Sequence, residues 1–301
     1  MPATVDISVV MVGMGTRDFV SDCLASLRAV DWGGYAHEIV YVDNNSKDDS
    51  VEMVRRDFPE VLCIANTVNR HFCPAANQGS KAAAGRYLLH LNNDTLVEPD
   101  FILPLMRFLE GNPKAAVAGV RLLNPDGSDQ WSARRFPAWY NAILGRRSLL
   151  TRFFPDSAIV RSYLFKDALL QEEPFRVEWT GTPCLLVRRD EFFEAGGFPE
   201  DYYYWHEAIF SHRLEKAGHE TWIVPRSRVT HFEGKGGGPR PYPVRRWHII
   251  DFSRGAYRFQ CERFGLGFFS PSRWFAAAAL WSRAALLLSV NWLSSQTEKK
   301  A

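Results

Sequence analysis

The chain of 301 residues lacks any run of twenty uncharged apolar residues, and its first six residues carry no Lys or Arg. A membrane-crossing helix needs about 20 consecutive apolar residues, and a secretory leader opens with a basic segment. The apolar run at residues 7–14 is short enough to be a strand. We therefore expect neither a leader nor a clean transmembrane span.

Cysteine is sparse and shows no paired spacing. The sequence has five cysteines, with no CxxC among them: Cys23, Cys63, Cys73, Cys184 and Cys261. Disulfide frameworks and structural zinc sites use even or closely spaced sets. The odd, scattered set predicts reduced thiols inside a cytoplasmic protein.

The chain has little net charge, formally +2, but its charges are unevenly placed. Residues 226–301 hold 13 Lys and Arg against 4 Asp and Glu, whereas the first 225 residues hold 23 against 30. A basic tail on an acidic body favours contact with phosphates or lipid headgroups. A solvated basic surface is the alternative, and the sequence leaves both open.

Apolar runs alternate with amphipathic segments over the first 125 residues. Strands are expected at residues 7–12, 39–42, 61–64, 87–91 and 115–123, and the segments between them repeat apolar residues at helical spacing. This alternation predicts an α/β fold with a mostly parallel sheet flanked by helices.

Regularity stops at the Asn-Pro-Asp-Gly turn of residues 124–127, and residues 128–175 are expected to leave the sheet as an irregular excursion. A strand at residues 184–187 resumes the pattern. The remaining expected elements are helices at 190–195 and about 206–217 and strands at 222–225 and 229–231.

Polar residues follow two of the expected strands. They are Asp-Asn-Asn-Ser at residues 43–46 and Asn-Asn-Asp-Thr at residues 92–95. Strand ends of one parallel sheet share an edge, which is where such sheets bind ligands. Asp43 could accept hydrogen bonds from a base or ribose, and Asp94 could hold a divalent cation that bridges a diphosphate. Turn and cap formation explains either cluster taken alone.

Five segments, in order, resemble the large inverting glycosyltransferase family 2, and in particular its bacterial rhamnosyltransferase-like branch. They are IVYVDNNSKDDS (39–50), NRHFCPAANQG (69–79), LLHLNNDTLVEPD (88–100), WTGTPCLLVRRDEFFEAGGF (179–198) and WHEAIFSHRLEKAG (205–218). The resemblance spans roughly residues 7 to 232. It implies a GT-A fold and a hexosyltransferase that uses a Mg²⁺ or Mn²⁺ ion. The implied donor is dTDP-rhamnose or a UDP-linked hexose, and the implied acceptor is a glycan or a lipid-linked sugar of the cell envelope.

On the donor side, the resemblance implies that Asp43 contacts the nucleotide base, with Asn45 in the same binding segment. Asn77 and Gly79 match an asparagine-glycine pair that lies along the donor pocket. The Gly-Met-Gly of residues 13–15 departs from the family's usual Thr-Tyr-Asn, which weakens any base contact there.

At the metal, Asn92, Asn93 and Asp94 take the place of the family's DxD-type element. Asp94 is the expected ligand, because the first acidic position has become Asn92. The resemblance also places His231 near the metal or the phosphates. Lys235, in the glycine-rich loop that follows, suits a segment that closes over a diphosphate. A surface loop with an incidental lysine is the alternative.

For catalysis, the family has Glu-Asp at the start of the helix that ends in a Lys-Ala-Gly-like sequence. Counting back from residues 216–218, that pair falls on His206 and Glu207. Glu207 therefore takes the place of the general base, which removes the proton of the acceptor hydroxyl as it attacks. His206 is expected to tune or position it. A helix-start Glu favoured by the helix dipole is the alternative.

The resemblance places Trp179, Gly181 and Thr182 near the acceptor and the nucleotide sugar. Trp179 could stack on a sugar face, and core packing is the alternative for this large ring.

The tail combines arginines with tryptophans around an apolar body. This pattern favours a helix that lies in the headgroup layer over one that spans the membrane. We therefore expect a catalytic domain at residues 1–244 and a helical extension at residues 245–301, at the inner face of the plasma membrane. Packing on the catalytic domain or in a homodimer is the alternative.

Three other functions are weighed against transfer. A dinucleotide-binding oxidoreductase is disfavoured, because Asp18 stands where the third glycine of its fingerprint belongs. A nucleic-acid module would rest on the basic tail alone. A GT-A scaffold that binds a nucleotide sugar without transferring it stays open, since Asn92 and His206 replace acidic residues of the family.

Overall fold

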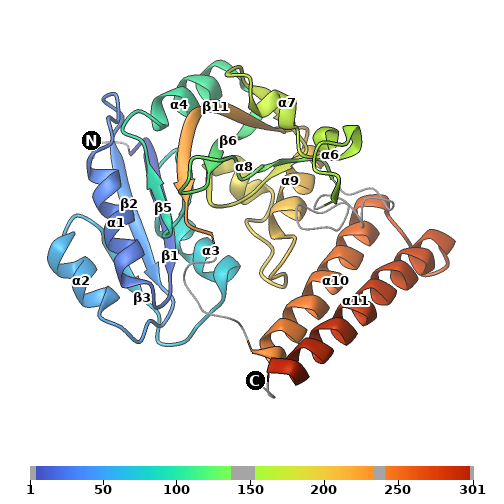
Figure 1. Cartoon of the computed structure of the whole chain (residues 1–301). Coiled ribbons are helices and arrows are strands. Elements are labelled where there is room, and N and C mark those ends of the chain that lie inside the picture. Colours follow the sequence, from blue (N-terminus) through green and yellow to red (C-terminus); the bar gives the residue numbers. More distant parts are fainter. Residues whose placement is uncertain (1–4, 137–152, 234–240, 299–301) are drawn as a thin grey trace.

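The computed structural model of the chain describes residues 5–136, 153–233 and 241–298 (Figure 1). Within these residues, a mixed, mostly parallel sheet of nine strands has the order β3-β2-β1-β4-β10-β6-β11-β5, and β8 pairs with β11. The strands β7 and β9 form a separate two-stranded sheet. The strands are β1 Ile7–Gly13, β2 His37–Asp43, β3 Leu62–Ala65, β4 Tyr87–Asn92, β5 Thr95–Val97, β6 Ala115–Leu123, β7 Ala133–Arg134, β8 Phe175–Val177, β9 Trp179–Thr180, β10 Cys184–Arg188 and β11 Glu220–His231.

Helices cover both faces of the large sheet, as the sequence predicts. They are α1 Arg17–Arg28, α2 Ser50–Asp57, α3 Phe72–Ala82, α4 Ile102–Gly111, α6 Ala158–Tyr163, α7 Lys166–Leu169, α8 Arg189–Glu194, α9 His206–Lys216, α10 Tyr242–Phe264 and α11 Pro271–Glu298. One hydrophobic core joins the sheet to α1, α2 and α4, and a second joins it to α3, α8 and α9. In α1 the buried residues Val20, Cys23, Leu24 and Leu27 recur at helical spacing, which places all of them against the sheet.

The direction of the strands follows the order of the chain. The strands β3, β2, β1 and β4 run parallel, because helical crossovers connect them. The strand β10 lies antiparallel between β4 and β6, and β11 returns to run parallel to β6. The α/β fold class that the sequence predicts is therefore confirmed.

The sequence missed some of the shorter pairings. The two closing strands expected at 222–225 and 229–231 are one strand, β11, whose register against β6 shifts between Val224 and Arg228. That irregularity interrupts the apolar alternation and makes one strand look like two. The short strands β5 and β8 pair antiparallel with β11 and have too few residues to show a period.

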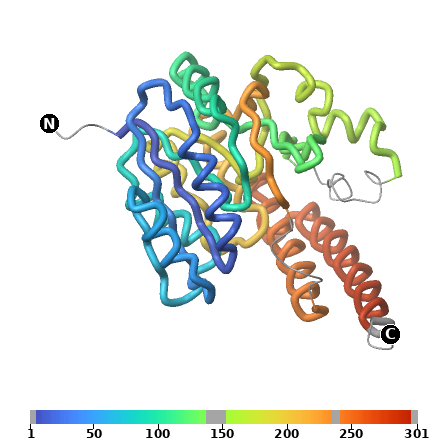
Figure 2. Tube along the Cα trace, turned by 60° about the vertical axis from the view of Figure 1, so that its left-hand side comes forward, coloured from blue at the N-terminus to red at the C-terminus, as the bar shows by residue number. Residues whose placement is uncertain are grey.

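The last two helices form a hairpin, α10–α11, that projects from the body of the molecule (Figures 1 and 2). The helix α10 contacts α9 of the catalytic body on one side and α11 on the other. By length and composition, α11 could cross a membrane. The expectation of no clean span is corrected to that extent, since α11 is long and apolar enough for one although Arg273 and Arg283 lie within it.

Gly79 allows α3 to approach the sheet closely. A Cβ atom added at this position would lie 2.7 Å from Cγ1 of Val10 and 3.1 Å from Cγ2 of Val42. We expect Gly79→Ala to lower the free energy of unfolding by about 1–3 kcal/mol, since a well-packed core resists an added methyl group. Urea unfolding monitored by circular dichroism measures this change.

The matched control is Gly111→Ala at the end of α4, where an added Cβ meets no atom within 4 Å. This control is expected to unfold at the same urea concentration as the native chain or slightly above it. Equal stability of the two variants would contradict the close approach of α3.

Candidate active site

Loops that follow the parallel strands meet at one edge of the sheet. The backbone N–H of Asn44 donates to the carbonyl of Gly13 at 2.8 Å, which joins the loops after β2 and β1. The backbone N–H of Asn92 donates to the carbonyl of Pro183 at 2.9 Å, which joins the end of β4 to the segment that enters β10. Because β10 runs antiparallel to β4, its entry lies at the carboxyl edge, where ligands bind in α/β sheets.

Asp43 is buried at the end of β2, and its carboxylate organises the loop after that strand. It accepts the backbone N–H of Ser46 at 2.9 Å and also the Ser46 hydroxyl. The phenol of Tyr41 donates to its Oδ2 at 3.3 Å, and burial together with the nearby Asp43 charge raises the pKa of Tyr41, so this donor keeps its proton. Asn45 lies in the same turn with a φ of 71°, and its Oδ1 accepts a bond from Lys47. Any base contact of Asp43 would use lone pairs beyond those engaged in the turn.

Gly13 explains the departure of the first strand from the family pattern. A Cβ atom at this position would lie 2.5 Å from the hydroxyl of Tyr41 and 3.1 Å from Nδ2 of Asn93. The amide of Asn93 donates in turn to the hydroxyl of Thr16 at the start of α1. Glycine therefore lets the ends of β1, β2 and β4 approach one another.

Asp94 and His231 face each other across the edge. Nε2 of His231 lies 3.3 Å from Oδ1 of Asp94, and His231 is opposite Thr95 in the β11–β5 pairing. The amide of Phe232 donates to the carbonyl of Asp94 at 2.9 Å, which fixes this spacing. Oδ1 of Asp94 is buried and accepts no hydrogen bond from the described residues.

A divalent cation fits this pair. A buried carboxylate oxygen without a donor is costly. Carboxylates suit Mg²⁺ and Mn²⁺, and imidazole is a ligand of several other divalent metals. In the part of the chain that the structure describes, no group of three or more His, Cys, Asp and Glu side chains gathers as a ready cage. A cation held here would take further ligands from phosphate oxygens or water.

Glu207 lies in the first turn of α9, and its side chain contacts the segment that enters β10. The hydroxyl of Thr182 donates to Oε1 of Glu207 at 3.3 Å. Pro183, the next residue, is the one bonded to Asn92, so Glu207 and the Asp94 loop belong to one connected edge.

His206 packs between two aromatic rings and makes only a long contact with Glu207. Its ring lies against Phe72 and Phe198, and its Nδ1 donates to the carbonyl of Tyr203 at 3.1 Å. The same nitrogen is 3.5 Å from Oε2 of Glu207. The contact with Glu207 is therefore at the outer limit of an interaction, and the hydrogen bond to Tyr203 is the shorter one.

Trp205, immediately before α9, has a left-handed backbone with a φ of 72°. That conformation costs about 1–3 kcal/mol for a bulky residue and persists only where packing enforces it. Its indole N–H donates to the carbonyl of Phe252 at 3.1 Å, and its ring stacks on Phe259. Both partners lie on α10, and Gly255 of the same helix leaves room for the ring, since a Cβ there would be 2.9 Å from Cδ1 of Trp205. The sequence missed this support because the partners are about fifty residues away.

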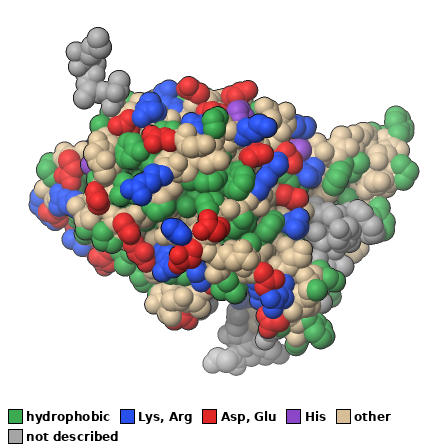
Figure 3. Space-filling view, turned by 90° about the horizontal axis from the view of Figure 1, so that it is seen from above, with side chains coloured by type: hydrophobic (Ala, Val, Ile, Leu, Met, Phe, Trp, Pro, Cys, Tyr) green, Lys and Arg blue, Asp and Glu red, His purple; other side chains and the backbone are tan. Residues whose placement is uncertain are grey.

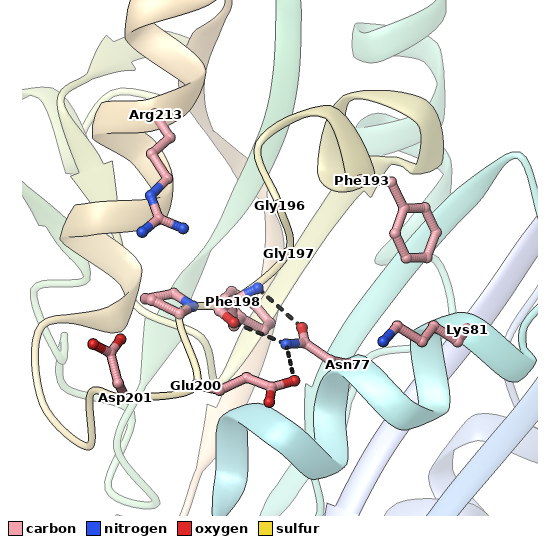
Figure 4. A pocket seen from close by; sticks show the side chains of 10 residues that line it. Asn77, Lys81, Phe193, Gly196, Gly197, Phe198, Glu200, Asp201 and Arg213 are labelled. Atoms are coloured by element: carbon pink, nitrogen blue, oxygen red, sulfur yellow. Dashed lines mark hydrogen bonds between the residues drawn. The ribbon is translucent and has the colours of Figure 1, made fainter.

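The asparagine-glycine pair expected along the donor pocket lies inside the structure. Both ends of the Asn77 amide bond the backbone of Phe198, at 2.8 and 2.9 Å, and its Nδ2 also bonds Glu200 (Figure 4). Asn77 lines a cavity of about 300 Å³ together with Lys81 and Arg213. Gly79 faces Val10, as described above. These contacts are structural, so a donor contact would need Asn77 to exchange a bond that it already makes.

The residues expected near the acceptor divide into two groups. Thr182 contacts Glu207, and Gly181 is its neighbour. Trp179 is buried, its indole N–H donates to the carbonyl of Arg135 at 2.8 Å, and it belongs to a cluster with Phe136. The structure therefore favours the packing alternative for Trp179, because a buried ring offers no face to a sugar. Lys235 lies outside the described residues.

The sequence of this chain matches a known protein family. The family described as Glycosyl transferase family 2 matches residues 8–174, more than half of the chain. The chain belongs to this family.

Curated relatives of this glycosyltransferase include two rhamnosyltransferases. It is 27% identical over 273 residues to the N-acetylglucosaminyl-diphospho-decaprenol L-rhamnosyltransferase of Mycobacterium tuberculosis, over 87% of this chain and 86% of that protein. It is 21% identical over 250 residues to the rhamnosyltransferase WbbL of Escherichia coli, over 80% of this chain and 89% of that one. The glycosyltransferase is thus rhamnosyltransferase-like, as its sequence motifs predict.

Solved structures share its fold. The mannosyltransferase PcManGT from Pyrobaculum calidifontis, in complex with GDP-Man and Mn²⁺, aligns with a TM-score of 0.57 at 17% identity, over 98% of this chain and 81% of that one. GalNAc-T7 with UDP, GalNAc and Mn²⁺ aligns with a TM-score of 0.60 at 18% identity, over 88% of this chain and 50% of that longer one. The GT-A fold that the sequence predicts is confirmed.

The packing of Trp205 on α10 generates a prediction for catalysis. We expect Gly255→Ala to push the indole away, shift the start of α9 and slow donor consumption about 10-fold, since a displacement of about 1 Å at a reacting group can cost more than that. Steady-state rates, measured together with the thermal midpoint, test this.

Gly267→Ala in the turn between α10 and α11 is the control, because a Cβ there meets nothing within 4 Å. It is expected to keep the native rate. A native rate in Gly255→Ala would show that α10 does not position Glu207.

Proposed function

We propose that this glycosyltransferase moves a sugar with inversion from a nucleotide diphosphate donor bound at the carboxyl edge of the sheet. One observation carries the proposal: Asp94 faces His231, and Glu207 contacts Thr182 in the segment hydrogen-bonded to the end of β4. A metal-binding carboxylate and a second carboxylate at one edge are what an inverting, metal-assisted transfer requires.

Oδ1 of Asp94 and Nε2 of His231 would hold the divalent cation. When bound, that cation offsets the charge of the donor diphosphate and of the nucleoside diphosphate that leaves. Asp43 and Asn45 bind the nucleoside, and Asn92 and Asn93 line the phosphate end of the same pocket. Gly181 completes the proposed donor contacts among the described residues.

Glu207 acts as the general base. The acceptor hydroxyl attacks the anomeric carbon opposite the diphosphate, its oxygen forms the new glycosidic bond, and the sugar–phosphate bond breaks. The hydroxyl proton passes to the Glu207 carboxylate, which the Thr182 hydroxyl orients. The bond to Tyr203 holds His206 beside the same side chain, with its Nδ1 3.5 Å from Oε2 of Glu207.

The names of the curated relatives support rhamnose as the sugar. We propose dTDP-rhamnose as its donor. The decaprenol-linked acceptor in the name of the mycobacterial relative supports a lipid-linked acceptor for this chain as well. The UDP and GDP-Man of the solved neighbours belong to those proteins and leave UDP-linked hexoses as the second donor class.

A lipid-linked acceptor requires a membrane surface, and we propose that the outer face of α11 contacts it. Along α11 the buried stripe contains Ala276, Leu280 and Ala284, which face the body of the hairpin. The exposed stripe includes the large apolar residues Trp274, Phe275, Trp281, Leu286, Val290, Trp292 and Leu293. Seen from above, the projecting part of the hairpin shows hydrophobic and uncharged atoms (Figure 3).

The two arginines of α11 turn toward α10. Nε of Arg273 donates to the hydroxyl of Tyr257 at 2.7 Å, and the Arg283 guanidinium lies 5.4 Å from the centre of the Phe252 ring. The helix α10 carries charged residues along its length, for example Arg246, Asp251 and Arg258, and cannot enter hydrocarbon. Since α11 packs along α10, we propose that it lies in the plane of an anionic membrane surface at the cytoplasmic side. We accordingly propose residues 245–301 as the membrane-contacting extension and residues 1–244 as the catalytic domain, although α10 itself begins at Tyr242.

The enzymatic proposal is tested with two substitutions. We expect Glu207→Gln to keep the thermal shift produced by dTDP-rhamnose with Mn²⁺ but to lower the transfer rate by at least about 100-fold, because it removes only the base. Asp94→Ala is expected to abolish the Mn²⁺-dependent shift.

The outcomes separate the alternatives. Native transfer in Glu207→Gln would refute its role as base. Donor binding by the native chain without transfer to any acceptor would identify a non-transferring scaffold instead. Asp43→Asn serves as a comparison that should weaken binding of the nucleotide without removing the metal response.

The membrane proposal is tested by flotation with vesicles rich in phosphatidylglycerol. We expect the double substitution Trp281→Ser with Leu286→Ser to lower the bound fraction about 10-fold or more, because each side chain contributes roughly 1.5–3 kcal/mol when buried.

The matched control is Leu62→Ser with Val68→Ser, two residues that are 48% and 62% exposed away from the hairpin. It should float as the native chain does. Equal flotation of both variants, or a stable dimer in size-exclusion chromatography that the α11 substitutions dissociate, would contradict lipid as the occupant of this face.

A further inference from the structure

We infer that Gln130 is a positioning residue that fixes the tautomer of His231 and so prepares its Nε2 to bind the divalent cation. The inference rests on the metal role proposed above for Asp94 and His231. Gln130 lies in the segment expected from sequence to be irregular, and no motif points to it.

The orientation of the Gln130 amide is set by a backbone atom. Its Nε2 donates to the carbonyl of His231 at 2.6 Å, and its Oε1 lies 2.8 Å from Nδ1 of the same residue. A carbonyl oxygen only accepts, so the NH₂ group must face it and the amide cannot be flipped. Oε1 therefore faces the imidazole.

The fixed amide dictates where the imidazole carries its hydrogen. Oε1 of Gln130 only accepts, so Nδ1 of His231 must be the donor. In neutral imidazole the other nitrogen, Nε2, then has a bare lone pair, which is the form that binds metal. Nε2 is 3.3 Å from Oδ1 of Asp94, a buried oxygen that accepts no hydrogen bond from any described residue. Two acceptors at this distance repel unless a positive species lies between them, and a divalent cation satisfies both.

The fold holds Gln130 firmly in this position. Its backbone N–H donates to the carbonyl of Leu122 at 2.9 Å. The preceding residue, Asp129, forms an ion pair with Arg121 of β6 at 2.6 Å. The turn at residues 124–127 thus returns the chain to the end of β6, beside the end of β11. Gln130 is 4% exposed, so water does not compete for its two bonds to His231.

The test measures Mn²⁺ affinity by electron paramagnetic resonance, without nucleotide and with dTDP. We expect Gln130→Met to weaken Mn²⁺ binding about 10-fold to 100-fold, the usual cost of losing a group that orients a metal ligand. His231→Ala should weaken binding at least as much. In the double variant, the Gln130 substitution should have no further effect, because its action passes through His231.

Gln78→Met is the matched control, since Gln78 is also bonded through both ends of its amide, to Asn66 on another part of the edge. It should bind Mn²⁺ as the native chain does. Two results would overturn the inference while the metal proposal stands. One is native Mn²⁺ affinity in Gln130→Met, and the other is that Gln130→Met lowers the Mn²⁺ affinity equally in the native chain and in His231→Ala. If the native chain binds no Mn²⁺, with or without dTDP, both the inference and the metal proposal are overturned. If only Asp94→Ala loses Mn²⁺ binding, the metal proposal stands and the inference about Gln130 does not.

Discussion

The antiparallel insertion of β10 between β4 and β6 is the constraint on which the site depends. Through it the amide of Asn92 meets the carbonyl of Pro183, and residues about ninety positions apart share one edge of the sheet. Had β10 been parallel, its entry would lie at the opposite edge, and Thr182 would be a strand length away from Asp94. The proposed metal ligand and the proposed base are therefore brought together by strand direction, which the hydrogen-bonding pattern of two neighbouring strands enforces.

The helix α10, which carries none of the proposed site residues, packs against the turn that precedes α9. The left-handed backbone of Trp205 stores strain two residues before Glu207, and α10 holds it in place through the carbonyl of Phe252 and the space left by Gly255. Strain of this kind persists only where the surrounding structure enforces it. A helix that the sequence assigns to an appendage is thus part of the packing that positions the start of α9.

Much of the fold could be predicted because its signals are local. Buried strands such as β1 and β4 are apolar runs, and the helix α1 shows a clear apolar face. The polar residues at the ends of β2 and β4 pointed to the edge where Asp94 lies. What could not be predicted depends on contacts between distant segments. Gln130 bonds a residue 101 positions away, the ring of Trp179 is buried in a cluster with Phe136 and Phe259, and the side-chain amide of Asn77 bonds Phe198. Nothing within a few residues of these side chains indicates such partners.

The two arginines of α11 show how far composition alone can mislead. In the sequence, Arg273 precedes an apolar run and Arg283 interrupts it, whereas in the structure both turn toward α10 and leave the outer face of α11 uncharged among the described side chains. Phe252 is contacted by Arg283 on one side and by the ring of Trp205 on the other, at 5.1 Å between ring centres. One side chain therefore joins the face proposed to meet lipid to the strained turn before Glu207. Because packed interiors transmit strain, a shift of α11 against α10 reaches Trp205, two residues before the proposed base, through two contacts.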